Sequence, residues 1–123
     1  MCQMLLSINP QHVERIMSGE KRFEFRRNRC KREVDKIIIY ATAPIQKVVA
    51  EVSLLDILEG TIEEVWEQTK EYAGVKKEFY NHYFEGKETA FAYKLDSVKI
   101  YDEPLSLEHF GVKQAPQSYQ YIV

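Results

Sequence analysis

The chain has 123 residues, of which 45% are hydrophobic and 29% are charged, with eight tyrosines and six phenylalanines. These values are ordinary for a globular domain that is large enough for a hydrophobic core, and they exclude a disordered chain. The formal net charge is only −2, yet the positive charge is concentrated in one segment.

Cysteine usage and hydropathy indicate the compartment. Cys2 and Cys30 are the only cysteines, and since neither has a CxxC partner they form no disulfide framework. The apolar runs are too short for a membrane span, and no signal-peptide pattern opens the chain. We therefore expect one domain over residues 1–123 in the reducing cytoplasm.

The first predicted elements are a short strand at residues 5–8 and a helix directly after it. Asn9 suits the N-cap of that helix, and Pro10 suits its first position. Apolar residues follow at helical spacing, and Gly19 suits the position just after the helix end.

The segment 23–26 alternates phenylalanine with charged residues, which is the period of two typical of a strand. The two phenylalanines are expected to face the core. Glu24 and Arg26 would then share the opposite face of this strand.

The remaining elements are predicted from apolar runs and helix caps. Further strands are expected at 36–43, 48–58, 90–101 and 116–123. A capping box at Thr61 and Glu64 begins a helix that runs to about Tyr72, and a second helix at 76–84 turns an aromatic face to the core. This order favours an α+β fold in which about five to six mostly antiparallel strands curl into a small β-barrel with two to three flanking helices.

The most informative segment is residues 21–32, which holds seven basic residues and one acid, a formal charge of +6. Such a concentration attracts polyanions, and phosphate is the obvious candidate. Arg26 and Arg27 offer planar, forked donors to a phosphate. The plain alternative is a solvated sheet edge protected by charge.

Glu24 is the one acid in this basic segment, which suggests a specific site. Glu24 and Arg26 form either a plain ion pair or part of a cleft in which Glu24 accepts from a base or ribose and Arg26 holds a phosphate. Lys21 is either a surface lysine or a phosphate ligand, and burial would lower its pKa and make it reactive. Tyrosines on predicted strands are candidates for stacking on unpaired bases: Tyr40, Tyr119 and Tyr121.

Metal and cofactor chemistry is not indicated. His12, His82 and His109 share no metal-ligand spacing. The chain has no glycine-rich phosphate loop and no nucleophile elbow. We therefore expect neither a metal nor another cofactor.

Several blocks of the sequence resemble ASCH domains, which belong to the PUA-like superfamily. The opening blocks are LLSINP at 5–10, IMSGEK at 16–21 and FEFRR at 23–27. Blocks similar to one bacterial and phage branch are IYATAP at 39–44 and PQSY at 116–119. The resemblance covers nearly the whole chain, and it implies a small β-barrel with a cleft beside the first helix and the second strand.

The resemblance also implies RNA binding, coactivator-like transcription regulation, or a role in RNA or nucleotide metabolism. Some members resemble amidohydrolases that act on acylated cytidine with a lysine, a threonine three residues later, and a glutamate near the end of a following helix. Lys21 matches the lysine, but Glu24 stands at the threonine position, and Glu71 is close to the glutamate position without matching it. Glu24 cannot supply the hydroxyl nucleophile, so that reaction does not transfer intact.

Three functions stay open at this point. The first is an RNA- or nucleotide-binding module in which Lys21, Arg26 and Arg27 contact phosphate. Its other ligand-binding candidates are Glu24, Tyr40, Thr42, Gln117, Ser118 and Tyr119. The second is a small hydrolase, either an amidohydrolase acting on acylated nucleosides or a ribonuclease, with Lys21 and Glu24 as the reactive pair. The third is a protein-interaction domain whose basic loop binds an acidic partner.

Overall fold

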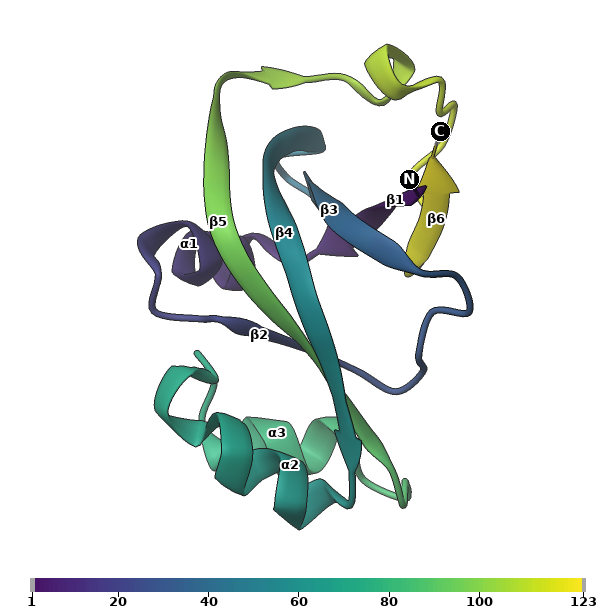
Figure 1. Cartoon of the computed structure of the whole chain (residues 1–123). Coiled ribbons are helices and arrows are strands. Elements are labelled where there is room, and N and C mark those ends of the chain that lie inside the picture. Colours follow the sequence, from purple (N-terminus) through teal and green to yellow (C-terminus); the bar gives the residue numbers. More distant parts are fainter. Residues whose placement is uncertain (1, 123) are drawn as a thin grey trace.

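The computed structural model describes residues 2–122, which fold into six strands and three α-helices (Figure 1). The strands are β1 (Cys2–Ile8), β2 (Phe23–Arg26), β3 (Val34–Ala41), β4 (Lys47–Gly60), β5 (Ala90–Leu105) and β6 (Tyr119–Ile122). The helices are α1 (Pro10–Ser18), α2 (Ile62–Thr69) and α3 (Lys77–Tyr83), with short 3-10 turns at Lys70–Tyr72 and Leu107–Phe110. The predicted α+β class is confirmed.

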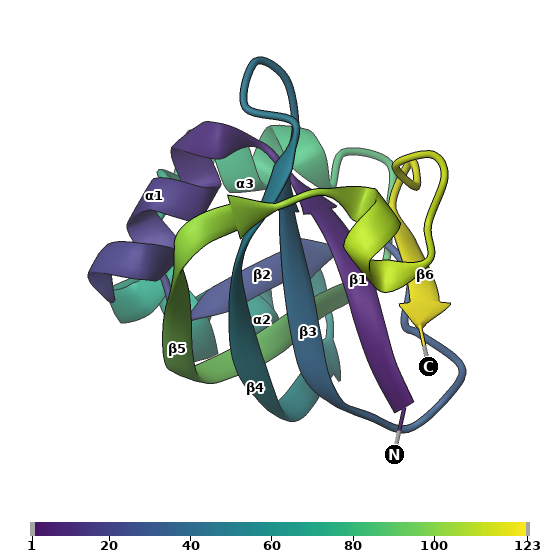
Figure 2. The same cartoon turned by 90° about the horizontal axis from the view of Figure 1, so that it is seen from above.

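The strands form one mixed sheet in the order β2-β5-β4-β3-β1-β6. β1 and β3 are parallel, and the other neighbouring pairs are antiparallel. Figure 2 shows β5, β4, β3 and β1 side by side, with α1 beside β5. Within residues 2–122 the hydrogen-bonded ladder ends at β2 on one side and at β6 on the other, so the sheet does not close into the predicted barrel.

The gap between the two edge strands is crossed by a side chain instead of a backbone ladder. β2 and β6 have four residues each. Arg26, the last residue of β2, donates from Nη1 to Ser118 Oγ just before β6 and from Nη2 to the carbonyl of Ser7. A polar side-chain contact therefore stands where a barrel would have its last pair of strands.

The helix caps predicted from the sequence are mostly confirmed. Asn9 is the extended N-cap residue of α1 and Pro10 its first residue, although the Asn9 side chain makes no capping hydrogen bond. The capping box of α2 is present, because Thr61 Oγ1 accepts from the Glu64 N–H at 3.1 Å and Glu64 Oε1 accepts from the Thr61 N–H at 3.0 Å. The predicted helix to Tyr72 is split, since α2 ends at Thr69 and continues as a 3-10 turn.

Three apolar clusters hold the elements together. The largest packs α1 against β1, β3, β4 and β5, and a second packs α2 and α3 against β2 and the start of β5. The third lies on the other face of β1 and β3, beneath the segment after β5. No helix within residues 2–122 has both the length and the apolar character needed to cross a membrane. The first two clusters fix α1, β2 and α3 around a common space.

A tight turn after the 3-10 segment 70–72 brings backbone against the start of β2. The carbonyl of Ala73 accepts from Lys21 Nζ at 2.8 Å, and the carbonyl of Gly74 accepts from Arg15 Nη1 at 2.7 Å. Gly74 has a φ of +68°, and an added Cβ would collide with Cβ and Cγ of Lys21. Glycine is therefore required both for the left-handed backbone and for the close approach.

We expect Gly74→Ala to destabilise the fold by roughly 2–4 kcal/mol, because it combines left-handed strain with overpacking against Lys21. Gly86→Ala is the matched control, since Gly86 has a φ of +80° but nothing within 4 Å of an added Cβ. The control should lose only about 1–2 kcal/mol. Urea unfolding of both variants measures the difference, and equal losses would contradict the close contact at Gly74.

Candidate functional site

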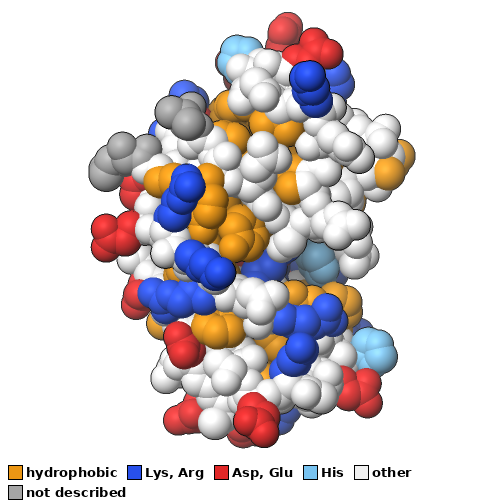
Figure 3. Space-filling model, turned by 90° about the vertical axis from the view of Figure 1, so that its right-hand side faces the viewer, with side chains coloured by type: hydrophobic (Ala, Val, Ile, Leu, Met, Phe, Trp, Pro, Cys, Tyr) orange, Lys and Arg blue, Asp and Glu red, His pale blue; other side chains and the backbone are white. Residues whose placement is uncertain are grey.

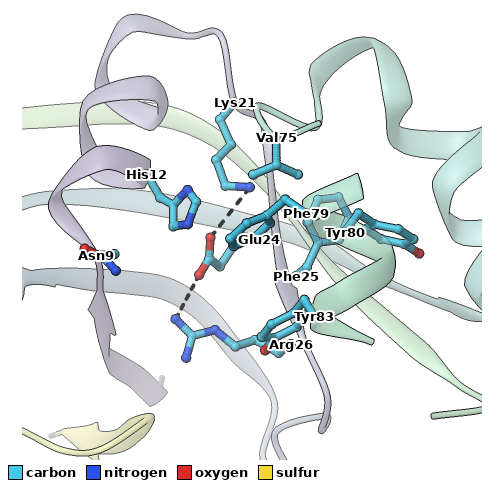
Figure 4. Close-up of a pocket in the computed structure, with 10 residues that line it drawn as sticks. All are labelled: Asn9, His12, Lys21, Glu24, Phe25, Arg26, Val75, Phe79, Tyr80 and Tyr83. Carbon is cyan, nitrogen blue, oxygen red and sulfur yellow. Dashed lines mark hydrogen bonds and ion pairs between the residues drawn. The ribbon is translucent and has the colours of Figure 1, made fainter. Parts of the chain in front are cut away.

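A cleft of about 240 Å³ lies between α1, β2 and α3 (Figure 4). Its polar lining consists of Asn9, His12, Lys21, Glu24 and Arg26. Its apolar and aromatic lining consists of Phe25, Val75, Phe79, Tyr80 and Tyr83. Figure 3 shows a hollow near the middle of one face, with Lys or Arg and His side chains inside it. The cleft lies where the family resemblance implies one, beside the first helix and the second strand.

The alternation along β2 positions the polar groups as predicted. Phe23 and Phe25 pack into the cluster formed with α2 and α3. Glu24 and Arg26 share a face, and Arg26 Nη2 donates to Glu24 Oε2 at 2.8 Å. The ion pair and the cleft, which the sequence left as alternatives, are therefore both present at the same place.

Lys21 is buried, with 3% of its surface exposed, so it is not a surface lysine. Its ammonium donates to the Ala73 carbonyl, and it lies 3.9 Å from Glu24 Oε1 and 4.7 Å from the centre of the Phe25 ring. Burial lowers the pKa of Lys21, and the nearby Glu24 only partly opposes this effect. A buried amine of this kind, in a cleft, is a typical feature of functional sites.

Glu24 is held between two cations. Figure 4 shows Lys21 and Arg26 reaching the carboxylate from opposite sides. Glu24 is 6% exposed, and one carboxylate leaves one positive charge uncompensated when both partners are charged. Arg26 also has a buried Nε without a hydrogen-bond partner among residues 2–122. The cleft is therefore prepared for an additional anion or acceptor.

His12 lines the cleft. It was not predicted as a site residue from the sequence, because the histidines were considered only as possible metal ligands. Its ring packs edge-on to Phe79, with the centroids 5.4 Å apart. Its Nδ1 is buried without a hydrogen-bond partner among residues 2–122. Burial lowers the pKa of His12 below its ordinary value of 6.5, so its imidazole is neutral at pH 7. The sequence did contain a signal for this position: His12 lies four residues before the buried Ile16 and is therefore on the same side of the helix.

The aromatic wall was also only partly predicted. Tyr80 and Phe84 are buried in the core, as expected for the aromatic face of this helix. Phe79 is 46% exposed, and Tyr83 is half-buried, and both line the cleft. One helix thus contributes its aromatic residues both to the core and to the site.

Arg27 and Ser118 are the two predicted residues that lie next to the cleft without lining it. The Arg27 guanidinium lies 4.2 Å from the centre of the Tyr83 ring, and its Nε donates to the Tyr83 carbonyl. Ser118 accepts from Arg26 Nη1 at 3.2 Å. Both residues are therefore connected to the cleft through groups that do line it.

Four other predicted residues lie outside the cleft: Tyr40, Thr42, Gln117 and Tyr119. Tyr40 is 6% exposed and packs in the cluster on the other face of the sheet, so its ring offers no face to a base. Thr42 begins the turn after β3, and Gln117 is exposed before β6. Tyr119 is half-buried on β6, with its ring centroid 5.5 Å from that of Tyr121.

The residues that match the amidohydrolase pattern do not come together. Lys21 lines the cleft, but Glu71 lines a separate hollow beside Arg22 and Tyr72. Residues 2–122 also contain no group of three or more His, Cys, Asp or Glu side chains arranged for a metal ion.

Comparisons with known proteins identify the family. The ASCH domain model matches residues 6–99, a range that includes α1, β2 and most of β5. A crystal structure of ASCH from Zymomonas mobilis has a TM-score of 0.89 and 29% sequence identity, and the match covers 98% of this chain and 87% of that chain. The resemblance seen in the sequence is therefore confirmed over most of its length.

Curated proteins give two further matches. An ASCH domain-containing ribonuclease from Zymomonas mobilis is 33% identical over 94 residues, which are 76% of this chain and 64% of that protein. The large ribosomal subunit protein uL22 of Ureaplasma parvum is 26% identical over 120 residues, which are 97% of this chain. The chain spans only 39% of the length of that protein. With the family match over residues 6–99, these findings show that the chain belongs to the ASCH domain family.

Proposed function

We propose that this chain binds single-stranded RNA and holds one nucleotide in the cleft. The observation that carries the proposal is the group formed by buried Lys21, buried Glu24 and half-buried Arg26, which leaves an excess positive charge beside an aromatic wall. A phosphate would neutralise that charge, and a base would cover the exposed ring of Phe79. The ribonuclease named among the relatives supports RNA as the ligand class.

The size of the cleft favours a single nucleotide. Its volume of about 240 Å³ is slightly below the usual range of roughly 300–1,000 Å³ for small-molecule sites. Such a space suits one unstacked nucleotide and excludes a duplex. The Asn9 side chain, which makes no capping bond, is available to read the base edge.

Arg26→Gln should weaken the binding of a short oligonucleotide by about 10- to 100-fold, because a charge-assisted contact to phosphate is lost. Arg22→Gln removes the same charge from an exposed arginine that lies beside Tyr72 and away from the cleft, and it should have little effect. Fluorescence anisotropy with labelled oligouridylate, at several salt concentrations, measures both variants. Equal effects of the two substitutions would contradict a specific phosphate contact in the cleft.

A second candidate function is RNA cleavage, which is favoured by the neutral His12 and the buried Lys21 in one cleft. The ribose 2′-oxygen would attack the neighbouring phosphorus while its proton passes to His12 Nδ1. The bond from phosphorus to the 5′-oxygen would break, and that oxygen would take a proton from Lys21 Nζ. Arg26 would stabilise the negative charge on the phosphoryl oxygens.

In this mechanism Glu24 positions the cations and does not act as the base. Its Oε2 already accepts from Arg26, and its Oε1 faces Lys21. The sequence suggested Lys21 and Glu24 as the reactive pair. We propose Lys21 and His12 instead, with Glu24 held between Lys21 and Arg26.

The cleavage rate should be bell-shaped in pH. It should rise as pH increases through the pKa of His12, which lies below 6.5, because His12 accepts a proton only when neutral. It should fall as pH increases through the pKa of Lys21, which lies below 10.5, because Lys21 donates only when charged. His12→Ala should lower the rate by about 100-fold or more and remove the acid limb.

Cleavage of a labelled oligonucleotide, corrected for the uncatalysed reaction, measures this profile. His109→Ala is the control, because His109 lies on the 3-10 turn at Leu107–Phe110 and does not line the cleft. Turnover that keeps its pH profile in the His12→Ala variant would remove His12 as the base. A pure protein without turnover would leave RNA binding as the only function of the cleft.

A further inference from the structure

Part of the basic segment 21–32 lies outside the cleft, on the loop between β2 and β3. Arg29 is 3.6 Å from Glu59, but Lys31 and Arg32 form no ion pair with any of residues 2–122. Both are exposed. The loop therefore presents two uncompensated positive charges beyond those used in the cleft.

The backbone of this loop is held in place by two tyrosine hydroxyls. The Tyr93 hydroxyl accepts from the Cys30 N–H at 2.8 Å. The Tyr121 hydroxyl accepts from the N–H groups of Lys31 and Arg32, at 2.8 and 3.1 Å. The backbone of Lys31 and Arg32 is thus fixed relative to the sheet, which a simple solvated loop would not require.

Three arginines of the segment lie over tyrosine rings: Arg22 over Tyr72, Arg27 over Tyr83 and Arg32 over Tyr121. The first pair lies at a separate hollow away from the cleft. The Arg32 guanidinium is 4.5 Å from the centre of the Tyr121 ring, and the Arg27 guanidinium is 4.2 Å from the centre of the Tyr83 ring. Both arginines are exposed. Unpaired bases stack on guanidinium planes as well as on aromatic rings, so each Arg–Tyr pair is a stacking platform for a base.

The Arg27–Tyr83 platform borders the cleft, and Arg32 of the Arg32–Tyr121 platform lines a separate hollow beside residues 54–57. Tyr83 lines the cleft, and Arg26 connects the cleft to Ser118 at the start of β6. From Ser118 to Tyr121 the chain advances by about 10 Å, which corresponds to roughly three stacked nucleotides or fewer extended ones. Figure 3 shows Lys and Arg side chains and hydrophobic surface alternating around the central hollow.

We infer that a single RNA strand several nucleotides long lies across this face, with one nucleotide in the cleft and neighbouring bases on the Arg27–Tyr83 and Arg32–Tyr121 platforms. The inference rests on the proposed RNA binding and extends it, because it assigns the bases next to the bound nucleotide to two surface platforms outside the cleft. Lys31 contributes a phosphate contact beside the second platform.

The test compares a labelled hexauridylate with a labelled diuridylate by fluorescence anisotropy. Arg32→Lys keeps the charge but removes the planar group. We expect the hexanucleotide to bind this variant about 5-fold or more weakly, with an unchanged dependence on salt, because stacking on one base is lost. The dinucleotide should bind as it does to the unaltered chain.

Arg29→Lys is the matched control. Arg29 lies on the same loop and pairs only with the exposed Glu59, and no aromatic ring of residues 2–122 lies under its guanidinium. The control should bind both oligonucleotides normally. Thermal unfolding of both variants should match that of the unaltered chain, because both substitutions are on the surface.

Three results would overturn the inference. Arg32→Lys could bind the hexanucleotide normally, the unaltered chain could bind both lengths equally, or a polyglutamate peptide could displace the hexanucleotide as well as unlabelled RNA does. The last result would assign the loop to an acidic protein partner. If the unaltered chain binds the dinucleotide and the hexanucleotide with the same affinity, only the inference of an extended RNA strand fails. If it binds neither oligonucleotide, the proposed function fails as well.

Discussion

The ionic contact of Glu24 with Lys21 and Arg26 is the constraint on which the rest of this structure depends. Buried charges are costly unless they are paired, and removal of one partner leaves the others uncompensated. Here the compensation comes from several parts of the chain: Ala73 accepts from Lys21, and Ser7 and Ser118 accept from Arg26. Gly74 allows the backbone to reach Lys21 closely enough. The need to satisfy these groups links β1, β2, the segment before α3 and the segment before β6.

The same contact lies at the opening of the sheet. A closed barrel would pair β2 with β6 through backbone hydrogen bonds, and the Arg26 side chain would then lose the position from which it reaches both Glu24 and Ser118. In the observed arrangement the two edge strands are short, and a guanidinium bridges them. The edges of the sheet are thus protected by charge and by covering segments, as is common for exposed strands. At this opening, Arg26 connects the cleft to Ser118 in the segment before β6.

Local patterns predicted most of the fold, but of the predicted site residues only Lys21, Glu24 and Arg26 line the cleft. The period of two in 23–26 placed Glu24 and Arg26 on one face, and the Thr61–Glu64 capping box placed α2, because both signals act between residues that are close in sequence. Tyr40 could not be placed in this way, since the two faces of an apolar strand look alike until its neighbours are known. Helical spacing placed His12 on the same side of its helix as Ile16, but its contact with Phe79 joins segments that are far apart in the sequence. The strand order, and with it the open sheet, depends on contacts between distant segments.

The two halves of the basic segment 21–32 lie in different surroundings. The charge of the segment alone did not predict this difference. In its first half, Lys21, Glu24 and Arg26 are buried or half-buried and oriented by their contacts with one another, whereas Arg22 is exposed. Its second half stays in solvent, where charge is screened and contributes mainly to attraction over a distance. What gives the second half direction is the set of tyrosine contacts: hydroxyls of Tyr93 and Tyr121 fix the backbone, and the ring of Tyr121 lies under Arg32. The tyrosines therefore shape the basic segment as much as its charge does, because their hydroxyls and rings orient an exposed basic loop relative to the sheet.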